Sequence, residues 1–135
     1  MTRIHVVAGE ASGDVLGARL IAALRARRPD VEFSGIGGPR MAEQGVPSLF
    51  DYRELALMGL LEVLPKIFRL KRLLAEAEAD VATRRPDVLV TIDSPGFTLR
   101  LAERVKPLGI PVVHYVAPQV WAWRPGRVVK LKRKV

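Results

Sequence analysis

Apolar stretches alternate with amphipathic ones along the whole chain. Patterns typical of buried strands are predicted at residues 4–8, 31–36, 87–92 and 110–116, and a further short strand is expected at 48–50. Helical spacing is predicted at 15–28, from 39 to about 45, at 66–84 and at 98–106, with a basic helix after Pro125. Strands separated by helices imply right-handed βαβ units. We therefore expect an α/β fold in one domain over residues 1–135, with a Rossmann-like parallel sheet and helices on both faces.

Two of the helices have clear apolar faces. In the first, one face is expected to carry Leu16, Leu20, Ala23 and Leu24, with Ser12 or Asp14 as the N-cap. In the helix over 66–84, one face is expected to carry Ile67, Leu70, Leu74 and Ala77. These faces should pack against the sheet.

Charge is concentrated at the end of the chain. The net charge is +8, and six of the 22 lysines and arginines lie in the last twelve residues, without any acidic residue. A solvated helix face and contact with anionic headgroups or phosphate are the main interpretations of this segment, and nucleic-acid binding is a third that rests on the basic tail alone. No nucleic-acid-binding motif accompanies it, so no nucleic-acid partner is expected. The chain has no cysteine, which excludes disulfides and thiolate metal sites.

Glycine-rich turns follow the first two predicted strands. Gly9, Glu10, Ser12 and Gly13 lie in the first turn, where backbone N–H groups can approach a sugar or an anion at a helix N-terminus. Arg40 follows the second and can meet a phosphate. A tight turn with a purely structural role is the alternative for the first loop. Neither turn has the dinucleotide or Walker A pattern.

Asp93 stands at the end of a buried strand. Partial burial at the ligand-binding edge of a parallel sheet would raise its pKa toward that of a general base. The alternative is an aspartate that binds its own backbone in a turn.

The two histidines are far apart in the sequence. His5 is expected to be a core residue, and for His114 both a structural role and a place in the crevice remain open. Their separation does not suggest a metal site, and no cofactor is expected. Trp121 and Trp123 lie beside arginines, a combination that favours a membrane interface or a sugar face.

Residues 58–74 combine dense apolar surface with basic side chains. Such a segment can lie in the headgroup region of a membrane, and an ordinary core helix is the alternative. The expected membrane-facing residues are Leu60, Leu61, Leu64, Ile67, Phe68, Arg69, Lys71 and Arg72. Glu62 is a lone acid in this apolar run and needs a partner.

The motifs at residues 8–14, 37–41, 58–64, 92–95 and 114–124 occur in the order found in lipid-A-disaccharide synthases, so the chain resembles that family over nearly its whole length. The resemblance implies the N-terminal, acceptor-side half of a GT-B glycosyltransferase. It implies transfer of 2,3-diacylglucosamine from UDP-2,3-diacylglucosamine to 2,3-diacylglucosamine 1-phosphate (lipid X), with inversion and without a metal. In that family the residue matching Asp93 is the leading candidate for the general base. Substrate contacts are then expected from Gly9, Glu10, Ser12, Gly13, Arg40, Met58, Glu62, His114, Gln119 and Trp121.

The resemblance also implies a place in the cell, at the cytoplasmic face of the inner membrane as a peripheral protein. A homodimer of the full-length protein is left open. Gly96 stands where the family often has aspartate, which removes a second carboxylate but leaves Asp93. The family is two to three times longer, so a fragment without the nucleotide-binding half, inactive alone, is expected. A different GT-B or epimerase-type enzyme and a non-catalytic lipid-binding module are the alternatives.

Overall fold

The protein forms a parallel sheet, as the strand pattern predicts. The computed structural model describes residues 2–58 and 64–115. The strands are β1 (Arg3–Ala8), β2 (Glu32–Ile36), β3 (Val88–Ile92) and β4 (Val112–Tyr115), in the spatial order β2-β1-β3-β4. Every neighbouring pair is parallel. The predicted α/β class is therefore confirmed.

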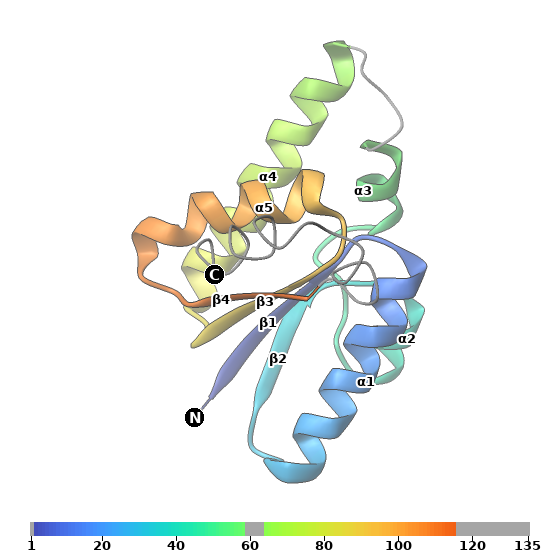
Figure 1. Ribbon diagram of the computed structural model, residues 1–135, viewed down its shortest axis with the longest axis vertical. Helices are drawn as coiled ribbons and strands as arrows, with labels where there is room; N and C mark the ends of the chain where they lie inside the picture. The colour runs from blue at the N-terminus through green and yellow to red at the C-terminus, as the bar shows by residue number, and fades with distance from the viewer. Residues whose placement is uncertain (1, 59–63, 116–135) are drawn as a thin grey trace, which may run out of the picture.

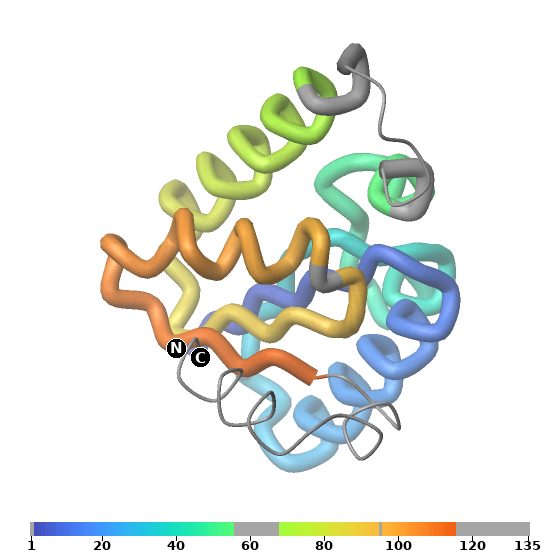
Figure 2. Tube along the Cα trace, turned by 45° about the horizontal axis from the view of Figure 1, so that its top comes forward, coloured from blue at the N-terminus to red at the C-terminus, as the bar shows by residue number. Residues whose placement is uncertain are grey.

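Helices cover both faces of this sheet (Figure 1). One face carries α1 (Ala11–Arg27) and α2 (Pro39–Glu43). The other carries α4 (Leu64–Arg84) and α5 (Pro95–Val105), with α3 (Arg53–Met58) near the upper end of α4. The 3-10 turn η1 (Lys106–Leu108) follows α5 and leads to β4. Figure 2 shows the same layers along the Cα trace.

Side chains along β1 alternate between two cores because successive strand residues point to opposite faces. Ile4, Val6 and Ala8 belong to the core under α1 and α2. Val7 belongs to the core under α4 and α5, where Leu74, Ala77 and Leu101 are also buried. The sheet is thus buried on both sides, as parallel sheets require.

The helix α1 differs from its prediction in two ways. It begins at Ala11, before the predicted residue 15, and its buried residues are Gly13, Asp14, Gly17 and Ile21. The predicted face is only partly buried at Leu16, Leu20 and Leu24, and Ala23 is exposed. The small residues lie inward because α2 packs close: a Cβ at Gly17 would lie 2.9 Å from Met41 Sδ.

Residues 48–50 do not form the predicted strand. One backbone bond, from Leu49 N–H to the Gly35 carbonyl at 2.9 Å, joins this segment to the edge of β2. The Ser48 hydroxyl instead accepts from Gly37 N–H at 3.1 Å and donates to the Phe50 carbonyl. These local bonds compete with a strand ladder.

The helix α4 agrees well with its prediction. It begins at Leu64, so Pro65 lies in the first turn, where its missing N–H costs no helical bond. Leu74 and Ala77 are buried and Leu70 packs against the core, as the spacing predicts. No described helix has the length and apolar character that crossing a membrane would require.

Candidate functional site

The sheet order creates a switch point between β1 and β3. The chain moves from β1 outward to β2, and then crosses back to β3 on the other side of β1. The loops after β1 and β3 therefore diverge at the carboxyl edge of the sheet, where open α/β sheets bind their ligands. Gly9 follows β1 and Asp93 follows β3, so two of the predicted site residues lie at this point.

Gly9 lets the two loops approach each other. A Cβ at this buried glycine would lie 2.4 Å from Ser94 Oγ and 3.2 Å from Leu55 Cβ. Gly13 is also buried, and its added Cβ would meet Ala8 Cβ at 3.2 Å. Gly9 thus allows close packing between the two loops, and Gly13 allows α1 to approach β1, so the structural alternative for this turn holds whether or not a ligand is also bound.

Asp14 ties the first loop to the second. Its carboxylate is 2% exposed and accepts three backbone N–H groups: Gly38 at 2.8 Å, and Arg40 and Met41 at 2.9 Å each. These donors stand at the start of α2, so Asp14 caps that helix. The predicted N-cap role of Ser12 or Asp14 is wrong, because both residues lie inside the first turn of α1 and Glu10 is the N-cap residue.

The polar residues of these loops lie at the rim. Glu10 and Ser12 are exposed at the N-terminus of α1. Arg40 is exposed on α2, and its guanidinium lies 3.8 Å from the Glu43 carboxylate. These side chains remain accessible to a ligand.

Asp93 occupies an unusual backbone conformation. Its φ is 48° and that of Ser94 is 47°, two consecutive left-handed residues that are not glycine. The Asp93 side chain is half-buried, and burial raises its pKa above the ordinary carboxyl value. Within the described part of the chain, no hydrogen bond or ion pair engages this carboxylate. The turn alternative, in which the side chain binds its own backbone, is therefore wrong.

His114 lies on β4, opposite Thr91 of β3. Its Nδ1 is 2.6 Å from the Thr91 hydroxyl, and its Nε2 is buried without a partner in the described residues. Burial lowers the pKa of His114, so the ring is neutral at neutral pH. This geometry favours a structural role.

The predicted membrane surface is described only in part. Phe68 is 69% exposed on α4, and Lys71 and Arg72 are exposed as well. Arg69 forms an ion pair with Glu54 of α3. Met58, Leu64 and Ile67 lie in α3 and α4, at the ends that flank residues 59–63. The predictions for Leu60, Leu61, Glu62, Gln119 and Trp121 fall outside the described residues.

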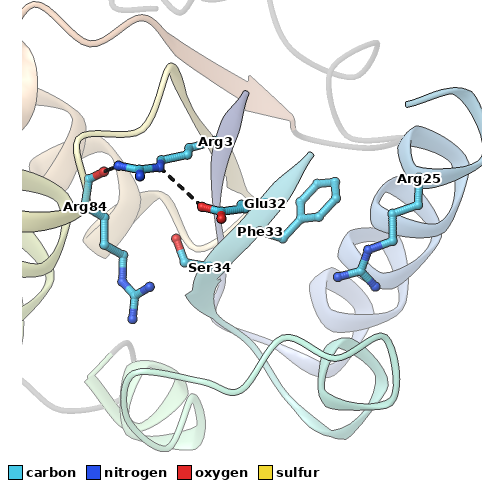
Figure 3. Close-up of a pocket in the computed structure, with 6 residues that line it drawn as sticks. All are labelled: Arg3, Arg25, Glu32, Phe33, Ser34 and Arg84. Carbon is cyan, nitrogen blue, oxygen red and sulfur yellow. Dashed lines mark hydrogen bonds and ion pairs between the residues drawn. The ribbon is translucent and has the colours of Figure 1, made fainter. Parts of the chain in front are cut away.

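A cavity of about 580 Å³ lies at the opposite, amino edge of the sheet (Figure 3). None of the predicted site residues lines it; its walls are Arg3, Arg25, Glu32, Phe33, Ser34 and Arg84. Arg3 is already paired with Glu32 at 3.3 Å, and Arg84 with Asp80 at 2.9 Å. No group of three potential metal ligands occurs within residues 2–58 and 64–115.

These features define a fold class: a Rossmann-like parallel sheet with helices on both faces and a switch point between β1 and β3. Solved structures with this fold include a glycosyltransferase, SnogD, from Streptomyces nogalater, with a TM-score of 0.60 at 20% identity over 99% of this chain and 37% of that one. The S. aureus MnaA-UDP co-structure gives a TM-score of 0.59 at 15% identity, over 84% of this chain and 29% of that one.

The sequence comparisons are more specific. The family model described as lipid-A-disaccharide synthetase matches residues 4–135. Lipid-A-disaccharide synthases from Granulibacter bethesdensis and Myxococcus xanthus are 62% and 56% identical over 93% and 98% of this chain. The chain belongs to the lipid-A-disaccharide synthase family. It spans about a third of the length of these relatives, 32% and 35%.

Proposed function

We propose that this chain is the acceptor-side half of a lipid-A-disaccharide synthase that joins two diacylated glucosamines. The donor is UDP-2,3-diacylglucosamine and the acceptor is 2,3-diacylglucosamine 1-phosphate. The observation that carries the proposal is Asp93, a half-buried carboxylate at the switch point of the sheet that has no hydrogen bond or ion pair to residues 2–58 and 64–115. Family membership supports this choice of substrates, and the position of Asp93 supports its proposed role in the reaction.

The proposed step is a single displacement. The Asp93 carboxylate takes the proton of the acceptor 6-hydroxyl while that oxygen attacks the anomeric carbon of the donor. A bond forms between the oxygen and the anomeric carbon, the bond to the UDP oxygen breaks, and its electron pair leaves with UDP. Configuration at the anomeric carbon is inverted, and Asp93 ends the step protonated. Its raised pKa suits this task because it makes the carboxylate a stronger base.

Because the proposed substrates carry acyl chains, the enzyme must reach them at a membrane, and the α3–α4 region is the proposed contact surface. We propose that Phe68, Lys71 and Arg72 face the inner membrane, so that the protein works as a peripheral protein at its cytoplasmic face. An exposed aromatic ring beside cations is typical of surfaces that lie among lipid headgroups. A homodimer of the longer protein is compatible with this arrangement.

A transfer assay tests the proposal. The 135-residue chain would replace the matching N-terminal third of the Granulibacter relative, so that both halves of the enzyme are present. We expect disaccharide formation, and a loss of at least about a hundredfold in kcat for Asp93→Asn, because general base catalysis typically contributes that much.

Asp87→Asn is the matched control, because Asp87 precedes the same strand at the opposite edge of the sheet. It should keep nearly full activity. Full transfer by the Asp93→Asn variant would refute the assigned base. UDP release without disaccharide would instead indicate an epimerase-type reaction.

A further inference from the structure

One buried hydroxyl lies within hydrogen-bond distance of both carbonyls of the Asp93–Ser94 turn. Thr98 is fully buried in the first turn of α5. Its Oγ1 donates to the Asp93 carbonyl at 2.8 Å and lies 3.1 Å from the Ser94 carbonyl. Both left-handed residues of the turn are thus bound by a single side chain.

The turn needs such support. A residue other than glycine is strained in the left-handed region, and such conformations persist only where surrounding contacts impose them. From the other side, Asp93 N–H donates to the Tyr115 carbonyl of β4 at 2.9 Å. The Asp93 backbone is therefore fixed at its N–H by β4 and at its carbonyl by Thr98.

The side-chain position follows from this backbone. No hydrogen bond or ion pair from residues 2–58 and 64–115 directs the Asp93 carboxylate itself. The backbone, with its φ value of 48° and the bonds that maintain it, sets the direction in which the side chain leaves the chain. A change at Thr98 should move the carboxylate without touching it.

We propose that Thr98 is a positioning residue that aims the Asp93 carboxylate at the acceptor hydroxyl through the Asp93 carbonyl. The inference rests on the proposed role of Asp93 as the base. Thr98 itself touches no substrate in this account. Misplacing a reacting group by about 1 Å can cost a hundredfold in rate, so even a modest relaxation of the turn should be measurable.

The first test is a titration of the Asp93 carboxyl by NMR in the 135-residue chain. Because burial alone raises the pKa of Asp93, the midpoint reports where the carboxylate lies. Thr98→Val keeps the shape and removes the hydroxyl, and we expect the midpoint to fall toward the ordinary carboxyl value as the freed carboxylate becomes more exposed. Thr98→Ser keeps the hydroxyl and should restore the midpoint.

Two further variants separate positioning from stability. Ser34→Ala removes a hydroxyl that binds His5 at 2.8 Å at the amino edge of the sheet, and should lower stability without moving the Asp93 midpoint. Thr98→Ala replaces Thr98→Val if valine prevents folding, with the same expectation. An unchanged midpoint in the variant without the hydroxyl would overturn the proposal.

The second test is kinetic and uses the chimeric enzyme. We expect Thr98→Val to lower kcat by about tenfold with little change in KM, and Thr98→Ser to restore it. An unaltered kcat in an active Thr98→Val enzyme would overturn the proposal. Failure of the proposed function looks different: the Asp93→Asn enzyme would stay active while the titration still reported the effect of Thr98 on the carboxylate.

Discussion

The pKa of Asp93 is raised by burial and not by a charged neighbour. The carboxylate is half-buried, and within the described residues it has neither a cation nor a hydrogen-bond donor to stabilise its charge. Burial disfavours the charged form and raises the pKa. A strand-terminal aspartate is visible in the sequence, but its left-handed φ is not, because a residue other than glycine rarely adopts it.

The raised pKa of Asp93 predicts the acid limb of the pH profile. The carboxylate must be unprotonated to act as a base, so kcat/KM of the chimeric enzyme should rise with pH through a pKa above the ordinary carboxyl range. The measurement is kcat/KM from acid to neutral pH. A limb at the ordinary carboxyl value would mean that another carboxylate is being titrated.

His5 is a second buried titratable residue, and it lies in the core of the protein. Its ring is fully buried between β2 and α4, with Nδ1 2.8 Å from the Ser34 hydroxyl. Its Nε2 lies 3.9 Å from the Asp80 carboxylate, too far for a hydrogen bond, and is unpartnered in the described residues. The sequence predicts this core position correctly.

The burial of His5 predicts a loss of stability in acid. Burial lowers the pKa of His5 from 6.5 to about 4, although Asp80 raises it in part. The unfolded chain therefore binds a proton that the folded chain resists, and stability falls as pH drops from 6.5 to about 4. The loss amounts to about 3 kcal/mol.

Urea unfolding at neutral pH and near pH 4 measures this loss. His5→Gln retains a polar group for Ser34 but cannot titrate, so its free energy of unfolding should depend less on pH over the same range. An equal acid dependence in both proteins would exclude His5 as the cause.

At the scale of elements, hydrogen bonds to the Asp14 side chain connect α1 to the start of α2. Two backbone N–H groups of the five-residue helix α2, from Arg40 and Met41, and that of its N-cap residue Gly38 converge on its carboxylate. The sequence pattern predicts both helices and the glycines between them. It does not predict that a carboxylate in one helix caps the other, because that bond joins residues 24 to 27 positions apart.

Removing the Asp14 carboxylate should therefore destabilise the protein. We expect Asp14→Ala to lower the free energy of unfolding by about 3 kcal/mol, since it leaves buried donors without partners. Asp30→Ala, at an exposed position after α1, should change it by less than about 0.5 kcal/mol. Chemical denaturation compares the two, and equal small effects would show that water replaces the cap.

Two other predictions from the local sequence pattern, the strand at 48–50 and the buried face of α1, differ from the structure. The predicted strand at 48–50 has an apolar composition, but the Ser48 hydroxyl forms hydrogen bonds with nearby backbone groups. A single backbone bond, from Leu49 to Gly35, then joins the segment to β2. The Leu16, Leu20 and Leu24 face of α1 lines an apolar groove of about 430 Å³ beside Val113 and Tyr115 of β4. The periodicity predicted that the leucine face of α1 would be buried. The face that carries Gly13 and Gly17 is buried instead, because α2 packs closely against it at Gly17.

For the whole molecule, alternating strands and helices were sufficient to predict the parallel sheet and its two covered faces. The strand order, and with it the switch point that joins Gly9 to Ser94, emerges only from the structure. The membrane surface was predicted from composition, and the exposure of Phe68 on α4 is consistent with it.

That surface can be tested with vesicles. The chain should co-sediment with vesicles containing phosphatidylglycerol, and Phe68→Ser combined with Arg72→Glu should weaken binding by about tenfold, because the variant loses both the insertion of the exposed aromatic ring into the lipid and the attraction to anionic headgroups. Leu108→Ser is the control, since Leu108 is 45% exposed after α5, at the amino edge. Equal binding by all three proteins would place the lipid contact elsewhere.

The central claim is that the acceptor binds at the carboxyl edge of the sheet, between the loops after β1 and β3. The most direct measurement is an NMR titration of the isotope-labelled chain with a short-acyl analogue of 2,3-diacylglucosamine 1-phosphate. The account predicts saturable shifts centred on Gly9, Ser12 and Asp93. Shifts centred on Arg3, Ser34 and Arg84 at the opposite edge, with Asp93 unmoved, would contradict it.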